Sequence, residues 1–363
     1  MSDKVFMKGC EAIAEAAVRA GCRFYAGYPI TPQNEIPEYM ARRLPQVGGA
    51  FVQGESEIAS VNMVYGAGAG GTRSMTSSSS VGISLKSEGV SYCAGAQVPM
   101  VYVNMQRGGP GVGTIQAAQQ DYFQATKASG NGGFQMIVLA PSTVQEAVDM
   151  TYQAFDLAER DRSPVLILGD GVVGTIMEPV VLPEMKSDEE VAALKAKNRE
   201  WAIVGHSRDE KRGFLSPGYW STDMQEQHNK NLDAMYKRWA EEDVQVEELY
   251  LEDAELVFVA YGTSARIAKN AMELLRSEGH KVGMIRPKTL SPYPVKSFDK
   301  INYDVCKCVL DIEMSIPAQM LYDVKLAVRE RGKVDTCLRS GGNLIERDDI
   351  LKKAREILNG GAD

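Results

Sequence analysis

The chain has 363 residues, of which 44% are hydrophobic and 24% charged, a balance typical of a soluble globular protein with two or three domains. Its net charge of -8 and isoelectric point near 5.2 argue against nucleic acid or an anionic membrane as a partner. No apolar run approaches the roughly 20 residues that span a bilayer, and the N-terminal residues lack a signal-peptide core, so we expect a cytoplasmic location.

Strand-like and helix-like segments alternate regularly over residues 1–175. The apolar strands are continuous and are separated by helices, which is typical of a parallel sheet covered on both faces. We therefore expect a doubly wound α/β domain in this part of the chain. The expected strands are residues 23–27, 50–53, 98–105, 135–140 and 164–169, and the expected helices include residues 8–20 and 142–158.

Two helix starts carry capping signals. Thr31 is the expected N-cap of a helix with Pro32 at its first position, where the missing N–H costs nothing. Ser142 and Gln145 are the expected capping box at the start of helix 142–158.

The stretch from Gln53 to Gly82 has the composition of a ligand site. Glu55 and Glu57 precede a helix rich in glycine and alanine, and each glycine costs a helix about 1 kcal/mol relative to alanine. Close approach of a neighbouring backbone or of a flat bound molecule would explain these small residues. The alternatives are two solvated carboxylates favoured by the helix dipole and a flexible serine linker at 77–80.

Four loops follow expected strands, at the edge where parallel sheets bind their ligands. They are residues 28–31, 54–57, 77–80 and 106–113. The last, QRGGPGVG, lacks the lysine of a phosphate-binding loop and does not open a helix. Arg107 within it is suited to holding a small carboxylate, although a surface arginine in a mobile loop is an equally good interpretation.

Residues 176–252 interrupt the α/β pattern, and we expect a connector or arm that packs on the rest of the chain or on another subunit. A second α/β unit is expected over residues 253–363. Its expected strands are residues 256–260, 281–285 and 308–313, and its expected helices are residues 264–277 and 318–331.

Metal-binding patterns are weak throughout the sequence. The six cysteines are scattered, and the one close pair, Cys306 and Cys308, has the apolar neighbours of a reduced, buried strand. Gly169-Asp170-Gly171 followed by Asn198 imitates a magnesium diphosphate motif, but the segment between them does not read as a helix, so we reject that interpretation. We expect no metal ligands in this chain, and packing or surface positions for the isolated histidines His206, His228 and His280.

Several motifs occur in a specific order. They are GYPITPQNEIPEYM (27–40), QGESEIASVNMVYGA with MTSSSSVGISLK (53–86), QRGGPGVG (106–113), PVLILGDGVVG (164–174) and VFVAYGTSARIAKNAMELLRSEGHKVGMIRPKTLSPYP (257–294). Together they resemble the alpha chain of 2-oxoacid:ferredoxin oxidoreductases, and are most similar to the 3-methyl-2-oxobutanoate (2-oxoisovalerate) type. The resemblance implies a thiamine diphosphate pyrimidine-binding domain followed by a transketolase C-terminal-like domain.

The resemblance also implies roles for individual residues. Glu57 matches the catalytic glutamate that hydrogen-bonds N1′ of the thiamine pyrimidine ring. Thr31 matches a threonine that binds the substrate, Pro29 a residue that shapes the cofactor pocket, and Arg107 the arginine that pairs with the substrate carboxylate. A cofactor-contacting turn corresponds to Ser79 and Ser80, followed by Val81 where related enzymes have proline.

The implied reaction is the oxidative decarboxylation of a branched-chain 2-oxoacid to acyl-coenzyme A and CO₂, with reduction of ferredoxin. The resemblance implies a beta subunit that holds the diphosphate and Mg²⁺, together with gamma and iron–sulfur subunits that carry the clusters. The alternatives are 2-oxoglutarate or another 2-oxoacid as the substrate, a lipoamide- or transketolase-type thiamine enzyme, and a subunit that has lost catalysis.

Overall fold

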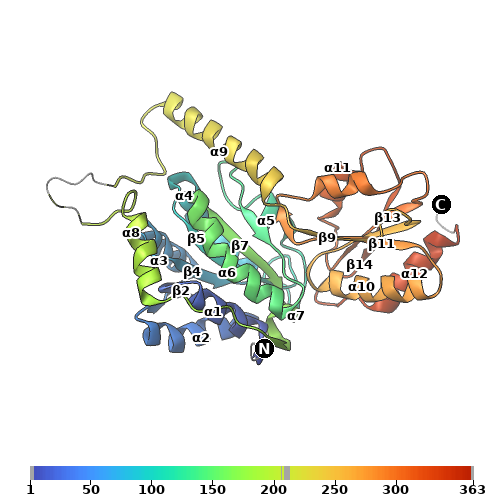
Figure 1. Cartoon of the computed structure of the whole chain (residues 1–363), viewed down its shortest axis with the longest axis horizontal. Coiled ribbons are helices and arrows are strands. Elements are labelled where there is room, and N and C mark those ends of the chain that lie inside the picture. The colour runs from blue at the N-terminus through green and yellow to red at the C-terminus, as the bar shows by residue number, and fades with distance from the viewer. Residues whose placement is uncertain (1–3, 206, 208–212, 361–363) are drawn as a thin grey trace.

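The structure is a computed structural model that describes residues 4–205, 207 and 213–360, so His206 lies outside the described residues. Two α/β units lie next to each other, each built on one sheet with helices packed against it (Figure 1). A long helix, α9 (Thr222–Glu242), packs on the first unit. No helix within the described ranges is long and apolar enough to cross a membrane.

The first unit contains a seven-stranded sheet in the order β12-β6-β7-β5-β4-β2-β3. Its neighbouring strands are parallel, except for β12 with β6. The expected parallel sheet is therefore confirmed, and every residue of β5 and β7 is buried. The strands are β2 (Phe24–Gly27), β3 (Ala50–Gln53), β4 (Ser74–Ser78), β5 (Met100–Gln106), β6 (Ile137–Leu139), β7 (Pro164–Asp170) and β12 (Thr289–Ser291).

Helices cover both faces of this sheet. One face carries α1, α2 and α6, whose core residues include Ile13, Met40 and Phe155. The other face carries α3 and α4, with Val61 and Val90 in its core. The helices of this unit are α1 (Gly9–Arg19), α2 (Glu35–Arg43), the 3-10 helix η1 (Leu44–Val47), α3 (Glu57–Ala69), α4 (Val81–Ala96), α5 (Tyr122–Thr126), α6 (Val144–Asp161) and α7 (Gly171–Thr175).

The second unit has a five-stranded sheet in the order β14-β13-β10-β11-β9, parallel except for β9. Helices α10 and α12 pack on one face, and α11 and the 3-10 helix η2 pack on the other. One hydrophobic cluster continues from this second face to α3 and α4, so the two units share a core. The elements are β9 (Val246–Leu249), β10 (Leu256–Val259), α10 (Gly262–Ser277), β11 (Val282–Pro287), η2 (Val295–Lys300), β13 (Cys308–Glu313), α11 (Leu321–Val328), β14 (Val334–Leu338) and α12 (Arg347–Leu358).

The segment between the two units contributes to both. β8 (Met177–Val180) pairs antiparallel with β1 (Val5–Lys8), and β9 joins the second sheet. α8 (Asp188–Asn198) follows β8, and α9 buries Trp239, whose indole N–H donates to Asp161 at 2.8 Å. Both ends of the segment thus pair with elements of the neighbouring units. The expected boundaries of the connector, at residues 176 and 252, stay a prediction.

Two expected helix starts are wrong. Residues 30–33 form a turn in which the N–H of Gln33 donates to the Ile30 carbonyl, so α2 begins only at Glu35 and Thr31 does not cap it. At α6 the N-cap is Thr143, whose hydroxyl accepts the N–H of residue 146 at 3.1 Å. Serine and threonine are both common N-cap residues, so at α6 the adjacent Ser142 and Thr143 leave the start uncertain by one position in the sequence.

Candidate functional site

The four expected site loops follow four adjacent strands. β5, β4, β2 and β3 are neighbours in the sheet and run parallel, so their carboxyl ends lie at the same edge. The loops that begin at Tyr28, Gly54, Ser79 and Arg107 leave the sheet directly at these ends. The sheet topology therefore brings the expected site residues to one edge.

Glu57 is the first residue of α3. Ser56 caps this helix by accepting the N–H of Ala59 at 3.1 Å, which fixes the direction in which α3 starts. The Glu57 side chain is buried, and its carboxylate lies so close to Gly82 that a Cβ there would be 2.5 Å from Oε1. Within the described residues this carboxylate has no hydrogen bond or ion pair. It is held in place by packing and not by a polar partner.

Lys86 of α4 is a buried neighbour of Glu57. Its ammonium group donates to the Thr76 hydroxyl at 2.9 Å and to the backbone carbonyl of Glu57 at 3.4 Å. Burial lowers the pKa of Lys86 to about 7, while the Glu57 charge opposes the change. The sequence analysis missed this lysine. Its position between Ile83 and Val90, on the buried stripe of α4, is the pattern that could have revealed it.

Arg107 and Thr31 are in direct contact. Nη1 of Arg107 donates to the Thr31 carbonyl at 3.0 Å, and the arginine is only 6% exposed. Its Nε is buried and has no hydrogen-bond partner among the described residues. The backbone N–H of Arg107 donates to the Ser80 hydroxyl at 3.0 Å. The structure therefore brings Thr31, Arg107 and Ser80 together. Pro29, which precedes Thr31 by two residues, is exposed.

Ser80 is the centre of a buried hydrogen-bond network at the start of α4. Its N–H donates to Asn104 Oδ1 at 2.9 Å, and its hydroxyl donates to Asp121 at 2.6 Å. Asn104 also donates to Asp121 at 2.9 Å. Burial raises the pKa of Asp121, although these two donors oppose the change. Ser80 adopts a φ of +34°, so its hydroxyl and strained backbone shape the turn, and the expected cofactor contact of Ser79 and Ser80 stays a prediction.

Several buried polar groups near this turn have no hydrogen-bond partner within the described part of the chain. They are the hydroxyls of Ser78 and Ser79 and the Nε of Arg107. Leaving such groups unpaired costs roughly 1–3 kcal/mol each, so they mark a place where a polar ligand can bind. Beside them, a cavity of about 320 Å³ lies between Ser80, the 109–111 loop and residues 316–319 of the second unit.

Asp170 joins the two units. It accepts the N–H of Thr263 at 3.0 Å and the Thr263 hydroxyl at 2.7 Å, and it also caps α7 through Val172 and Val173. Burial raises the pKa of Asp170, while these donors oppose the change. Among the described residues no group of three or more His, Cys, Asp or Glu side chains could hold a metal ion.

Comparison with protein families covers most of the chain in two parts. Residues 15–245 match the thiamine diphosphate-binding family of pyruvate flavodoxin/ferredoxin oxidoreductases, and residues 254–350 match pyruvate:ferredoxin oxidoreductase core domain II. The chain therefore belongs to the 2-oxoacid:ferredoxin oxidoreductase family, as its motifs predict.

Individual relatives refine this assignment. The chain is 45% identical to the ketoisovalerate oxidoreductase subunit VorB of Methanothermobacter marburgensis, over 97% of both chains. A solved 2-oxoglutarate:ferredoxin oxidoreductase from Magnetococcus marinus, with 2-oxoglutarate, coenzyme A and succinyl-CoA bound, superposes with a TM-score of 0.86 at 25% identity, over 98% of this chain and 66% of that one. A split-gene transketolase superposes at 0.60 with 12% identity, over 98% of this chain and 99% of its own, and shows the shared fold. The expected combination of the two α/β folds is thereby confirmed.

Proposed function

We propose that this chain is the alpha-type subunit of a thiamine diphosphate-dependent enzyme that oxidatively decarboxylates a branched-chain 2-oxoacid, 2-oxoisovalerate, to acyl-coenzyme A and CO₂ while reducing ferredoxin. The 45% identity to a ketoisovalerate oxidoreductase subunit over nearly the full length supports this substrate class. The observation that carries the proposal is the position of Glu57 at the carboxyl edge of the sheet, where its carboxylate is buried and has no hydrogen bond or ion pair with any described residue.

Thiamine diphosphate fits this edge. When bound, it supplies a carbon nucleophile and an electron sink for decarboxylation. Glu57 would hold a proton at the pyrimidine end of the cofactor, and the free hydroxyls of Ser78 and Ser79 would supply polar contacts beside it. Gly82 leaves room for the carboxylate, because any side chain at that position would meet Glu57.

Arg107 can bind the substrate carboxylate without leaving Thr31. Nη1 donates to the Thr31 carbonyl, and Nε has no partner in the residues that the structure covers. A carboxylate approaching the Nε side of the guanidinium would satisfy the buried N–H and gain a charge-assisted pair. Contact with the Thr31 carbonyl keeps the guanidinium oriented for this role.

Partner subunits would complete the site. We propose that a beta subunit holds the diphosphate and Mg²⁺, and that gamma and iron–sulfur subunits pass electrons to ferredoxin. The outer surface of α3 and α4, the two helices that begin near Glu57, supports this arrangement because large apolar side chains are exposed along it. They are Ile58, Met63, Leu85 and Tyr92.

The alternative substrate, 2-oxoglutarate, has less support. Its second carboxylate would need a second cation in the pocket, and the buried Lys86 is already directed at Thr76 and the Glu57 backbone. A 2-oxoglutarate synthase subunit, KorA of Methanocaldococcus jannaschii, is 36% identical over 96% of this chain, below the 45% of the ketoisovalerate subunit.

Glu57→Gln tests the proposal in the assembled complex. An amide cannot exchange a proton with the pyrimidine ring, so decarboxylation of 2-oxoisovalerate should stop, while the complex still assembles. Glu55→Gln is the matched control, because Glu55 is exposed and bonds only to Ser56 among the described residues. Normal turnover by Glu57→Gln would refute the mechanism.

Arg107→Ala tests the substrate contact separately. Loss of a charge-assisted pair worth ~1.5–3 kcal/mol should raise KM for the 2-oxoacid about 10- to 100-fold. An unchanged KM would refute the assignment of Arg107 and leave that of Glu57 standing.

A further inference from the structure

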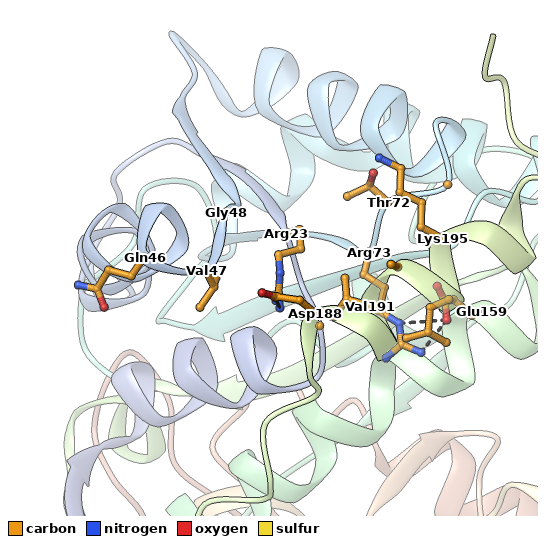
Figure 2. Close-up of a pocket in the computed structure, with 14 residues that line it drawn as sticks. Arg23, Gln46, Val47, Gly48, Thr72, Arg73, Glu159, Asp188, Val191 and Lys195 are labelled. Carbon is orange, nitrogen blue, oxygen red and sulfur yellow. Dashed lines mark hydrogen bonds and ion pairs between the residues drawn. The ribbon is translucent and has the colours of Figure 1, made fainter.

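A second cavity lies at the opposite edge of the seven-stranded sheet. It has a volume of about 450 Å³ and is built by Arg23 and Arg73, which precede β2 and β4, and by one side of α8 (Figure 2). These residues stand at the amino ends of parallel strands, whereas Glu57 follows the carboxyl end of β3. The cavity is therefore separate from the site proposed for the cofactor.

Arg73 lines this cavity, and its positive charge is neutralised by neighbouring carboxylates. Its Nε and Nη2 donate to Glu159 at 3.0 and 2.6 Å, and Nη2 also donates to Asp156 at 2.5 Å. Its Nη1 donates to the Ala20 carbonyl at 2.7 Å. Because each nitrogen of the guanidinium has a partner, Arg73 has little left to offer a ligand.

Arg23 is not satisfied in the same way. Its Nη1 donates to the Val18 and Cys22 carbonyls at 3.2 and 3.1 Å, but its Nη2 is buried and has no hydrogen-bond partner among the residues that the structure describes. Asp188 Oδ1 lies 3.7 Å from Nη2, beyond hydrogen-bond distance, and the Asp188 side chain is 90% exposed. Figure 2 shows the two side chains directed toward each other. A loosely held, solvated carboxylate thus occupies the place that an anionic ligand would take.

Lys195 provides a second available cation. It lies on α8 with Asp188, is exposed, and has no hydrogen bond or ion pair within the part of the chain that the structure describes. Val47, Val191 and Leu194 add apolar surface to the same cavity. Two available cations beside apolar side chains, in a volume within the usual range for small ligands, favour a small organic anion.

We propose that this cavity binds a small polyvalent anion, bearing phosphate or carboxylate groups, between Arg23 and Lys195. The ligand displaces the Asp188 carboxylate and supplies the acceptor that Arg23 Nη2 lacks. Since Arg23 lies directly before β2 and Lys195 lies on α8, the ligand also links the connector to the first unit.

Titration calorimetry of the full chain at low ionic strength tests this proposal, with pyrophosphate and citrate as probes. Saturable binding is expected, and Lys195→Met should weaken it about fivefold by removing an exposed charge. Arg23→Gln should weaken it about 10- to 100-fold, because the anion loses a charged, buried N–H donor. Asp188→Asn should strengthen it about threefold, since the competing carboxylate is gone.

Lys197→Met is the matched control, because Lys197 lies on the same exposed helix but does not line the cavity. If only pyrophosphate binds, the cavity is a phosphate site. If only citrate binds, it is a carboxylate site, and if both bind, the site selects its ligand by charge. The proposal is overturned if neither probe saturates, or if Lys197→Met weakens binding as much as Lys195→Met does. It is also overturned if Asp188→Asn does not tighten binding.

Discussion

Replacing Lys86 by methionine should stabilise the chain. The lysine is fully buried with a pKa of about 7, against 10.5 for an ordinary lysine. At about 1.36 kcal/mol per pH unit, this difference corresponds to roughly 4–5 kcal/mol of stability lost at pH 7. Methionine fills a similar volume, carries no charge, and gives up the hydrogen bonds to Thr76 and the Glu57 carbonyl, so the net gain should be about 3 kcal/mol.

The dependence on pH gives this prediction its sharpest test. The folded pKa of Lys86 lies below the unfolded value, so the cost is complete at pH 7 and below and disappears as pH rises from about 7 to 10.5. Urea denaturation of wild type and Lys86→Met at pH 7, 8 and 9 should show the advantage of the variant shrinking by about 1.4 kcal/mol per pH unit.

Lys352→Met provides the control, because this lysine is exposed on α12 and should change stability by less than about 0.5 kcal/mol. If Lys86→Met were less stable than wild type at pH 7, or if its advantage did not change with pH, the lysine would be charged and paired in the folded chain. The reasoning from burial would then be refuted.

Three further changes follow from the contacts described above. Gly82→Ala should push the Glu57 carboxylate and the Ser78 hydroxyl aside and lower kcat/KM of the assembled enzyme about 100-fold, with the melting temperature checking that the fold persists. Asp170→Ala should destabilise the chain by about 2–4 kcal/mol in urea, since it leaves buried donors unpaired, and an intact midpoint would contradict that role. The buried Arg286 pairs with Glu146 at 2.7 Å and helps to lower the pKa of Glu146 to about 2, so Arg286→Met should cost about 3–5 kcal/mol at pH 7. That cost should shrink as pH falls from 4.5 to about 2, where the carboxylate becomes protonated, and a constant cost in acid would count against the pair.

Much of the first sheet could be predicted because several of its strands can be recognised from their local sequence alone. The apolar runs that became β5 and β7 are continuous, and helices separate them, so a parallel order follows from general rules. β12 has only three residues and belongs to that sheet through a partner about 150 positions earlier in the chain. No periodicity reveals such a pairing. α12, by contrast, carries a readable stripe in Ile350, Ala354 and Ile357 that the sequence analysis left unused.

The candidate site could be predicted in part. Strand ends and glycines located the loops around Glu57 and Arg107, and the topology brings these loops to one edge. The hydrogen bond from Arg107 to Thr31 could not be foreseen, because it joins residues 76 positions apart through a side chain and a backbone carbonyl. The same holds for the contact between Lys86 and Thr76, which requires the packing of α4 on the sheet to be known.

β12 lies beyond the connector, yet it forms the outer border of the first sheet beside β6. A fragment ending near residue 253 would lack this strand and leave the backbone of β6 open to pairing with another molecule, which invites aggregation. Chimeras between relatives should therefore be joined after Ser291, so that the strand is inherited together with the sheet that it closes.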